Sequence, residues 1–220
     1  MVGSPAWKLS AECEEAVTGY CQVGGYDSTW LFSVIYSQHK LERIIPQSKV
    51  LRSTPAFSIG ALIPKFEFIG IKVDHPFPVG LIALESAFDS QLTDPERRFI
   101  LAHEYSHIVM NHAPYRLLGG VSSSIVTDYI SSIDDKTTRI WLGAAYVIIQ
   151  TAISQAFTRQ SELAADSNAV SLTGDRAGGI ETIRRLGETF GGNVGAPSHW
   201  ITRGKVNIPV VTYQERIDAL

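Results

Sequence analysis

The sequence predicts an α+β fold that is mostly helical and contains a small β-sheet. Three observations support this prediction. Apolar and β-branched runs punctuated by prolines occupy residues 50–85, which is typical of three short strands rather than of a helix. A strong helix start stands at residues 93–96, and a second long helix is expected from about residue 137 past residue 169.

The chain before the strands is expected to be a helical extension. The pattern AECEEAV favours a short acidic-faced helix from Leu9 to about Cys21. We therefore predict that residues 1–45 form an N-terminal helical extension. Residues 46–220 are then expected to form one compact unit.

The first long helix has clear boundary signals. Asp94 can cap the free amides, Pro95 suits the first helical position and Glu96 complements the helix dipole. The helix is expected to run to about His112. Pro114 should end it, because proline disfavours the helical conformation of the residue before it.

The rest of the chain alternates between helical and irregular patterns. Residues 119–135 are a weakly patterned stretch rich in Ser and Gly, and the second long helix follows it. Gly174 is expected to break that helix, and a third helix should cover residues 180–190. Residues 191–210 have the composition of a loop.

Composition excludes several classes of protein. The 220 residues carry 19 Lys and Arg against 22 Asp and Glu, and no basic run is present, so binding to nucleic acid is not expected. The two cysteines, Cys13 and Cys21, are too few for a disulfide framework, which favours a reducing compartment. The N-terminus lacks the pattern of a signal peptide, so we expect a cytoplasmic protein with possible membrane association.

A His-Glu-Xaa-Xaa-His motif lies in the first long helix. His103 and His107 stand at positions i and i+4, so both imidazoles lie on one helix face, near enough to bind one Zn²⁺ ion. Glu104 projects beside the open position of the metal, where it can take a proton from a water molecule whose pKa the metal lowers. The motif predicts one zinc ion per chain, with Glu104 as general base. A chance match on an ordinary amphipathic helix is the alternative.

A catalytic zinc needs a third protein ligand, and Glu162 is the candidate. Asp166 lies one turn further along the same helix face, so one carboxylate can bind zinc while the other orients a ligand imidazole. The flanking apolar residues favour a buried helix, and a buried carboxylate needs a cation or hydrogen-bond donors. The alternative is a solvated acidic pair on a helix surface.

Together, His-Glu-Xaa-Xaa-His and Arg-Xaa-Xaa-Glu-Xaa-Xaa-Ala-Asp resemble the motifs of the HtpX and type I CAAX prenyl protease family of gluzincin metallopeptidases. The resemblance covers roughly residues 50–220 and implies a zincin-like fold with its sheet beside the active-site helix. Residues 46–220 are then the zinc metallopeptidase domain, with a role in protein quality control. The implied site comprises the zinc ligands His103, His107 and Glu162, the base Glu104 and the supporting carboxylate Asp166.

The resemblance also implies a role for His199. In gluzincins a His or Tyr donor commonly stabilises the oxyanion of the tetrahedral intermediate, and His199 lies in a segment suited to that role. The His-Pro pair usual in the family is not intact, because Trp200 follows His199. Packing against Trp200, or capping of a loop, is the alternative.

One segment has the composition of a membrane span. Residues 140–158 are uncharged, and their length is close to the roughly 20 residues that cross a bilayer. Because Glu162 must reach the same zinc as the two histidines, the chain between the motifs cannot cross a bilayer an odd number of times, and only this segment is apolar enough to cross. A stripe of polar residues leads up to Glu162, so we predict a buried core helix. An interfacial role, or an anchor outside this sequence, stays open.

The other histidines carry weaker signals. His112 lies five positions after His107, about 500° around a continuous helix, so we expect a surface or helix-end residue away from the metal. His39 and His75 have no partner at a useful spacing. Arg159 matches the family motif, although by itself it could simply pair with an acidic neighbour.

These observations predict a zinc-dependent endopeptidase that hydrolyses extended or unfolded protein segments. Residues 79–85 are the expected sheet edge along which a substrate would add as a strand. The alternatives are a latent or non-cleaving zinc-containing binding or chaperone-like module, against which the presence of Glu104 argues, and a metallohydrolase acting on small amides. The physiological substrate, the oligomeric state and any need for activation are not specified by the sequence.

Overall fold

The computed structural model describes residues 17–22, 30–36, 56–68, 71–73, 76–203 and 206–220. The chain divides into two compact units, Met1–Arg97 and Arg98–Leu220. It passes from the first to the second within α4 (Asp94–Val109), the helix that carries the His-Glu-Xaa-Xaa-His motif. The described residues combine sheets with long helices, which confirms the α+β class.

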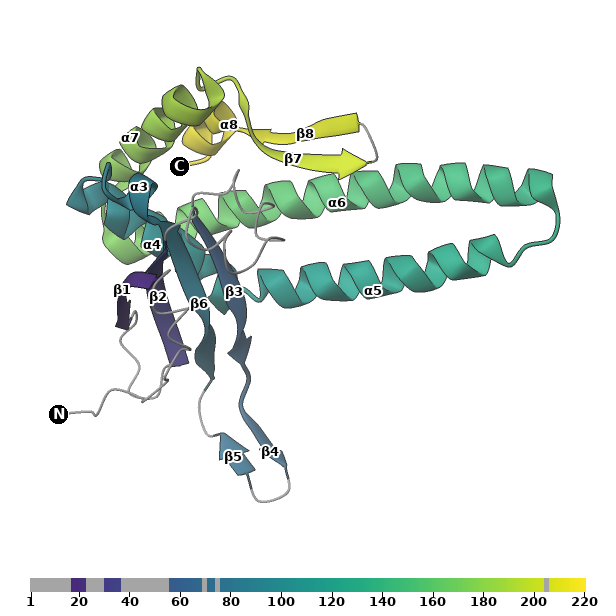
Figure 1. The fold of residues 1–220 in the computed structure, drawn as a ribbon, viewed down its shortest axis with the longest axis horizontal. Coiled ribbons are helices and arrows are strands. Elements are labelled where there is room, and N and C mark those ends of the chain that lie inside the picture. The colour runs from purple at the N-terminus through teal and green to yellow at the C-terminus, as the bar shows by residue number, and fades with distance from the viewer. Residues whose placement is uncertain (1–16, 23–29, 37–55, 69–70, 74–75, 204–205) are drawn as a thin grey trace. The chain divides into compact units, whose positions relative to one another are not determined.

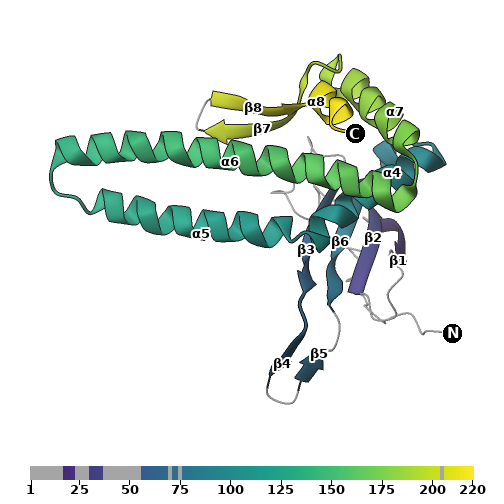
Figure 2. The ribbon, with the colours of Figure 1, turned by 180° about the vertical axis from the view of Figure 1, so that it is seen from behind.

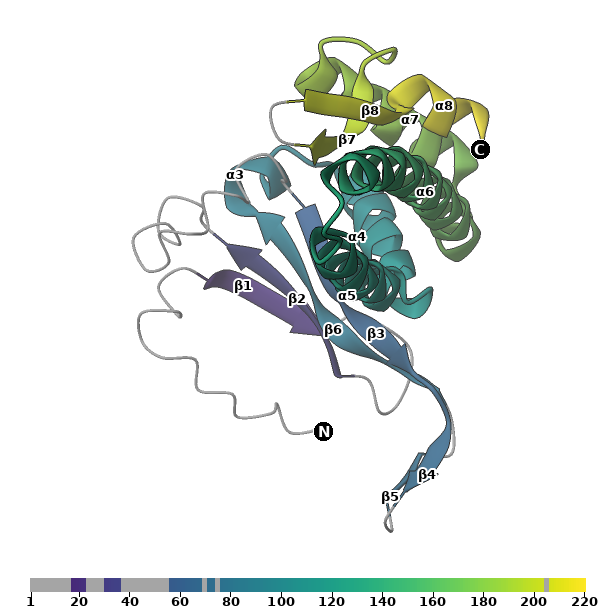
Figure 3. The ribbon, with the colours of Figure 1, turned by 90° about the vertical axis from the view of Figure 1, so that its right-hand side faces the viewer.

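The first unit is built on a mixed four-stranded sheet (Figure 3). Its strands, in spatial order, are β1 (Val17–Gln22), β2 (Trp30–Tyr36), β6 (Phe77–Glu85) and β3 (Ala56–Ile63). β6 pairs in parallel with β2, and the other pairs are antiparallel. The short strands β4 (Phe66–Phe68) and β5 (Ile71–Val73) pair as a separate ribbon, and α3 (Ser86–Asp89) follows β6.

The expectation that residues 79–85 form a sheet edge is wrong. They belong to β6, in which Leu81 pairs with Phe32 on one side and Ile59 on the other. β6 therefore has a hydrogen-bonded neighbour at each edge, and its residues from Ile82 to Leu84 are buried. Among the described strands of this sheet, β1 and β3 are the edges.

The helix expected from Leu9 to about Cys21 is wrong for the residues from Val17 onward. Val17–Gln22 is the strand β1, which pairs with β2. This segment contains Val17, Thr18 and Tyr20, which favour strands. The preceding residues, 1–16, lie outside the described part of the chain, and the boundary expected at residue 46 stays a prediction.

The second unit is mainly helical (Figures 1 and 2). After α4 its elements are α5 (His112–Ser131), α6 (Lys136–Thr173), α7 (Arg176–Leu186), the short π-helix η2 (Gly187–Gly191), β7 (Pro197–Arg203), β8 (Val206–Thr212) and α8 (Tyr213–Asp218). α5 and α6 run side by side as a long antiparallel hairpin, and β7 and β8 lie along α6 (Figure 1).

The helix start at residues 93–96 is confirmed, although a different residue forms the cap. Asp94 is the first helical residue, and Thr93 precedes it. The Thr93 backbone N–H and hydroxyl both donate to Glu96 Oε2, at 2.8 and 2.7 Å. Glu96 therefore stabilises the N-terminus of the helix, as in a capping box.

The end of α4 differs from the prediction. Asn111 adopts a left-handed conformation, with φ of 58°, and this turn separates α4 from α5. Pro114 lies in the first turn of α5, where a backbone N–H has no intrahelical partner, so it does not end a helix. The Ser- and Gly-rich stretch that follows, residues 119–135, is also helical as far as Ser131. Its weak periodicity has a physical reason: nearly all of these residues are exposed, so no single buried face imposes a pattern.

α6 confirms the second long helix and its end at Gly174, which has φ of 68°. The expectation of a buried core helix over residues 140–158 is wrong. The 18-residue apolar window of α6 is 0% buried, and the buried residues of this helix lie further on, from Ser161 to Ala169. The polar stripe leads to the buried face, as predicted, but the apolar residues beside it are exposed.

The C-terminal region also differs from the prediction. The third helix is found as α7, which begins before residue 180. Residues 191–210, expected to be a loop, contain β7 and most of β8, which pair as an antiparallel hairpin. Gln155 Nε2 donates to Pro209 O at 3.2 Å, which links this hairpin to α6.

The core of the second unit joins the helices that carry the two motifs. Phe99, Ala169, Ile183 and Tyr213 form a buried cluster that connects α4, α6, α7 and α8. Burial of a side chain such as Phe99 or Ile183 contributes about 1.5–3 kcal/mol. Gly179 lies so close to Phe99 that a Cβ there would approach its ring to 2.7 Å, so α7 packs directly against α4.

Candidate metal centre

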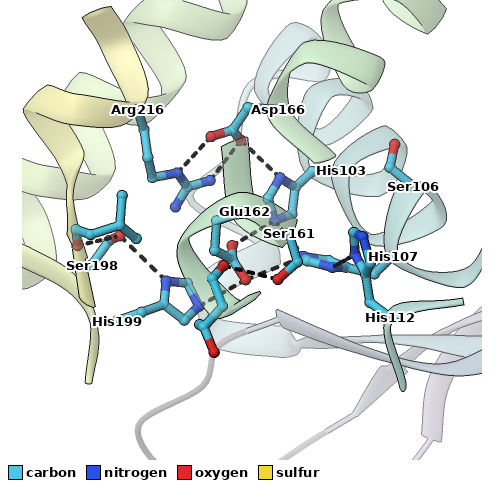
Figure 4. A network of polar contacts seen from close by, with 12 residues as sticks. His103, Ser106, His107, His112, Ser161, Glu162, Asp166, Ser198, His199 and Arg216 are labelled. Atoms are coloured by element: carbon cyan, nitrogen blue, oxygen red, sulfur yellow. Dashed lines mark hydrogen bonds and ion pairs between the residues drawn. The ribbon is translucent and has the colours of Figure 1, made fainter. Parts of the chain in front are cut away.

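Three side chains from α4 and α6 converge to form a candidate metal centre (Figure 4). His103 and His107 project from successive turns of α4, and Glu162 projects from α6. Their potential ligand atoms all lie within 4.8 Å of one another. The structure therefore brings together the three residues that the sequence predicted as ligands.

The two imidazoles present the same nitrogen to the centre. His103 Nε2 and His107 Nε2 lie 3.1 Å apart. The Glu162 carboxylate reaches both, with Oε2 at 3.4 Å from His103 Nε2 and Oε1 at 3.5 Å from His107 Nε2. This leaves the Nδ1 atoms to be oriented by other groups, which is the usual arrangement for metal-binding histidines.

Asp166 orients His103. Its Oδ1 lies 2.8 Å from His103 Nδ1, and the carboxylate is completely buried. An ionised carboxylate can only accept, so His103 Nδ1 donates this hydrogen bond. The tautomer that results has its Nε2 lone pair free for a metal.

His107 has a partner that the sequence reasoning missed. His112 Nδ1 lies 2.7 Å from His107 Nδ1, and His112 is buried, so its assignment to the surface is wrong. The estimate of about 500° holds only for a continuous helix, whereas the left-handed Asn111 ends α4 and returns His112 to the metal face. The polar Asn111, a residue type that tolerates this conformation, was the available signal.

Burial of His112 and the positive charges near it, chiefly on His107 and Arg116, lower its pKa to about 4. The imidazole is therefore neutral at pH 7. A neutral His112 can accept a hydrogen bond at Nδ1, so His107 Nδ1 can donate to it and present Nε2 to a metal.

The environment of Glu162 best tests whether a metal ion fits this site. The residue is 2% exposed, and its Oε2 has no hydrogen-bond partner among the described residues. A buried carboxylate oxygen without a donor is costly unless a cation neutralises it. Two imidazole nitrogens and one carboxylate also match the ligand set of catalytic zinc sites, so the residues fit the ion.

The charge pattern of the centre favours a cation. Burial alone would lower the pKa of His103, but Asp166 and Glu162 raise it to about 10. Burial would likewise raise the pKa of Glu162, whereas the imidazoles of His199, His103 and His107 hold it well below its usual range. The carboxylates thus attract positive charge to the imidazoles.

Arg216 is a second residue whose place in the site the sequence reasoning missed. It comes from α8, is buried and donates two hydrogen bonds to Asp166, from Nε to Oδ2 and from Nη2 to Oδ1, each of 2.7 Å (Figure 4). Asp166 keeps its pKa below the usual value although burial opposes this, because Arg216 and His103 lie beside it. A helix six residues long at the end of the chain gives little sequence signal for such a contact.

His199 also reaches the centre, from β7 rather than from a loop. Its Nε2 lies 3.5 Å from Glu162 Oε1, and its Nδ1 lies 3.3 Å from Ser198 Oγ. Burial, opposed by Glu162 but reinforced by Arg216, lowers its pKa to about 4, so the imidazole is neutral at pH 7. The side chain of Trp200, its proposed packing partner, lies outside the described part of the chain.

Four further residues from the sequence analysis remain to be placed. Glu104 lies on α4 between His103 and His107 and is 9% exposed. Arg159 pairs with Glu215 at 3.1 Å on the surface, as an ordinary ion pair would. His39 and His75 lie outside the described residues.

Two imidazoles and one carboxylate on neighbouring helices, beside the glutamate of a His-Glu-Xaa-Xaa-His motif, define the site of a metallopeptidase. The sequence profile of peptidase family M48 matches residues 64–201, and this match covers both motifs and more than half of the chain. The chain therefore belongs to peptidase family M48. Comparisons with curated proteins and with solved structures gave no match.

Proposed function

We propose that this metallopeptidase is a zinc-dependent endopeptidase that hydrolyses peptide bonds in extended or unfolded protein segments. One observation carries the proposal: the buried Glu162, whose Oε2 has no hydrogen-bond donor in the described part of the chain, faces the Nε2 atoms of His103 and His107. Of the metals that such a set accepts, zinc matches two imidazoles and one carboxylate together with the adjacent base.

Each residue has a defined task in this proposal. A bound Zn²⁺ supplies a Lewis acid, which lowers the pKa of water and polarises a carbonyl group. Glu104 accepts the proton from the attacking water and passes it to the nitrogen of the leaving amine. Asp166 and His112 fix the tautomers of the two ligand imidazoles, so that both Nε2 lone pairs point to the same place.

His199 is proposed to donate a hydrogen bond to the oxyanion that develops on the substrate carbonyl. Support comes from its distance of 3.5 Å to Glu162 and from its pKa of about 4, since a neutral imidazole keeps one N–H for donation. Such a donor typically accelerates turnover about 10²- to 10³-fold.

The finer assignment to an HtpX-like enzyme belongs to the same proposal. It is supported by the two motifs, His-Glu-Xaa-Xaa-His and Arg-Xaa-Xaa-Glu-Xaa-Xaa-Ala-Asp, and by the membership of family M48. Unfolded or extended protein as the substrate, and a role in protein quality control, come from that resemblance.

The test compares hydrolysis of an unfolded protein, such as reduced and alkylated lactalbumin, before and after removal of metal by a chelator. We expect activity to disappear with the metal and to return on addition of about one equivalent of Zn²⁺ per chain. A leucine anilide serves as the control substrate. Full activity after metal removal would refute the proposal, and hydrolysis of the anilide alone would favour a metallohydrolase that acts on small amides.

A further inference from the structure

Arg116 lies beside the metal centre and has no strong partner among the described residues. Its Nη2 lies 3.3 Å from Ser161 Oγ and 3.4 Å from Glu162 Oε1. Hydrogen bonds between a guanidinium and a carboxylate normally measure about 2.7–2.9 Å. The Arg116 guanidinium is therefore close to the centre, but its contacts there are long.

Two other arginines in the same region are better paired. Arg216 donates two hydrogen bonds of 2.7 Å to Asp166, and Arg159 pairs with Glu215 at 3.1 Å. Arg116 uses a single nitrogen for both of its contacts, although an arginine side chain carries five N–H donors on three nitrogens. In the part of the chain that the structure describes, Nε and Nη1 of Arg116 have no hydrogen-bond partner.

The exposure of Arg116 leaves these donors open to a ligand. Its side chain is 48% exposed, whereas the side chain of Glu162 beside it is 2% exposed. One nitrogen of the guanidinium thus reaches a buried carboxylate, while the rest of the side chain meets solvent. The buried Arg216, at 7%, has no such open side.

The charges of the centre favour an anion from outside the protein as the partner of Arg116. Asp166 is already balanced by Arg216. Glu162 is proposed to bind a divalent cation, whose charge exceeds that of one carboxylate, so its attraction for Arg116 falls when the metal is bound. Arg116 is then a half-exposed cation beside a site with no spare negative charge on Glu162 or Asp166.

Arg116 lies within reach of the place where a peptide bond would be cleaved. Arg116 Nη2 and His199 Nε2 both approach the same atom, Glu162 Oε1, at 3.4 and 3.5 Å. His199 is the proposed donor to the oxyanion that forms from the cleaved peptide group. An extended chain advances about 3.3–3.6 Å per residue, so a side chain one or two residues from that group can contact Arg116.

The start of α5 fixes the backbone of Arg116 relative to Glu162. Arg116 lies four residues after His112, so both side chains project from one face of α5. The rings of His112 and Tyr115 contact Phe157 of α6, with centroid distances of 6.2 and 6.4 Å. A donor group on a packed helix loses less conformational entropy when a ligand binds than one on a free loop.

We propose that Arg116 binds a carboxylate of the substrate, and that the enzyme prefers an acidic residue next to the cleaved bond. The inference rests on the proposed peptidase function and adds a substrate class to it. An endopeptidase binds a chain that continues on both sides of the cleaved bond, so the carboxylate belongs to an Asp or Glu side chain. A planar guanidinium matches such a group, because it donates two parallel hydrogen bonds to the two carboxylate oxygens.

The experiment measures binding, so its result does not depend on hydrolysis. The full chain carrying Glu104→Gln is supplied with Zn²⁺, and fluorescence anisotropy gives its Kd for short fluorescein-labelled peptides of one apolar sequence. One peptide has Glu at its centre and another has Gln, both with an amidated C-terminus. A third has Gln and a free C-terminal carboxylate. We expect the Glu peptide to bind at least about tenfold more tightly than either Gln peptide.

A matched set of further substitutions assigns the preference to Arg116. Arg116→Gln should abolish the difference in Kd between the Glu and Gln peptides. Arg116→Lys should keep part of it, because lysine retains the charge without the planar pair of donors. Arg139→Gln removes the same charge from an exposed position in the first turn of α6 and should keep the full difference. Circular dichroism and zinc per chain are measured for each variant, and Arg116→Lys decides the question if Arg116→Gln does not fold.

Four results would overturn the proposal. Equal Kd values for the Glu and Gln peptides, or no binding of either, would make Arg116 a solvated residue. A preference that survives in Arg116→Gln would mean that the carboxylate binds elsewhere, for example on the metal. Loss of zinc from a folded Arg116→Gln would mean that Arg116 serves to hold Glu162. Tight binding of the free C-terminus alone would contradict recognition of an acidic side chain. A protein without hydrolytic activity can still show the preference, so failure of the proposed function is distinguishable from failure of this inference.

Discussion

Arg216 donates a bidentate pair of hydrogen bonds to Asp166, and Asp166 in turn accepts from His103. The last helix of the chain, α8, is thereby connected through two buried side chains to a predicted metal ligand. Planar guanidinium and carboxylate groups match each other in this geometry, so the orientation of Asp166 is set by two bonds rather than by one.

Loss of this pair should weaken metal binding. We predict that Asp166→Asn lowers zinc affinity about 10- to 100-fold, because outer partners of ligand histidines typically contribute that much. Arg216→Gln should act in the same direction, since Asp166 is then held less firmly. Competition with a chromophoric chelator measures the affinity. Arg159→Gln removes an exposed ion pair and is the control. Equal zinc affinity in all four proteins would reduce Asp166 to a structural residue.

His112 should position His107. We predict that His112→Ala lowers zinc affinity by about tenfold or more, because His107 Nδ1 loses its acceptor. His112→Asn should restore part of the affinity, since the amide oxygen can accept the same bond. The absorption spectrum of the Co²⁺-substituted protein reports the ligand geometry directly. An unchanged spectrum and affinity in His112→Ala would show that the contact serves packing only.

The sequence predicted the residues of the candidate metal centre better than the residues that support them, because the two sets differ in the range of their interactions. His103 and His107 lie one turn apart on one helix, so their geometry follows from local spacing. Glu162 and Asp166 share a face of another helix in the same way. The position of His112 beside His107 depends on the left-handed turn at Asn111. Helical periodicity alone does not predict such a turn.

Non-local pairing explains the main errors in the fold. β6 pairs with β2 on one side and β3 on the other, and apolar residues alone do not reveal whether a strand is central or at an edge. The hairpin of β7 and β8 is formed by a segment whose composition resembles a loop. The apolar part of α6 was correctly predicted as a helix, but its composition does not show whether its side chains are buried in the protein or exposed.

The stability of α8 should depend on pH through Glu215. This side chain accepts from the Thr212 backbone N–H at 2.8 Å, and that hydrogen bond, aided by Arg159, lowers its pKa. A carboxyl group with a lowered pKa in the folded state stabilises the fold above its unfolded pKa, and this contribution disappears as the pH falls through its folded pKa. Urea unfolding of the wild type and Glu215→Gln, compared from pH 6 to about 3, should show a difference that vanishes on acidification. A difference that is constant with pH would contradict the assignment.

His199 should affect turnover more than metal binding. We predict that His199→Ala lowers turnover about 10²- to 10³-fold while zinc content, thermal stability and KM stay close to those of the wild type. Ser198→Ala removes the neighbouring hydroxyl and is the matched control. Normal turnover in His199→Ala, or a loss that follows unfolding, would remove His199 from the proposed catalytic residues.

The most direct test of the account separates the base from the ligands. Glu104→Gln, Glu162→Ala and the surface variant Glu188→Gln are compared for zinc per chain by atomic emission and for hydrolysis of an unfolded protein. The account predicts that Glu104→Gln retains about one zinc and loses hydrolysis by at least about 10³-fold, because its carboxylate is a base and not a ligand. Glu162→Ala should lose both the metal and the activity, and Glu188→Gln should keep both. Full activity in Glu104→Gln, or a full complement of tightly bound zinc in Glu162→Ala, would contradict the account.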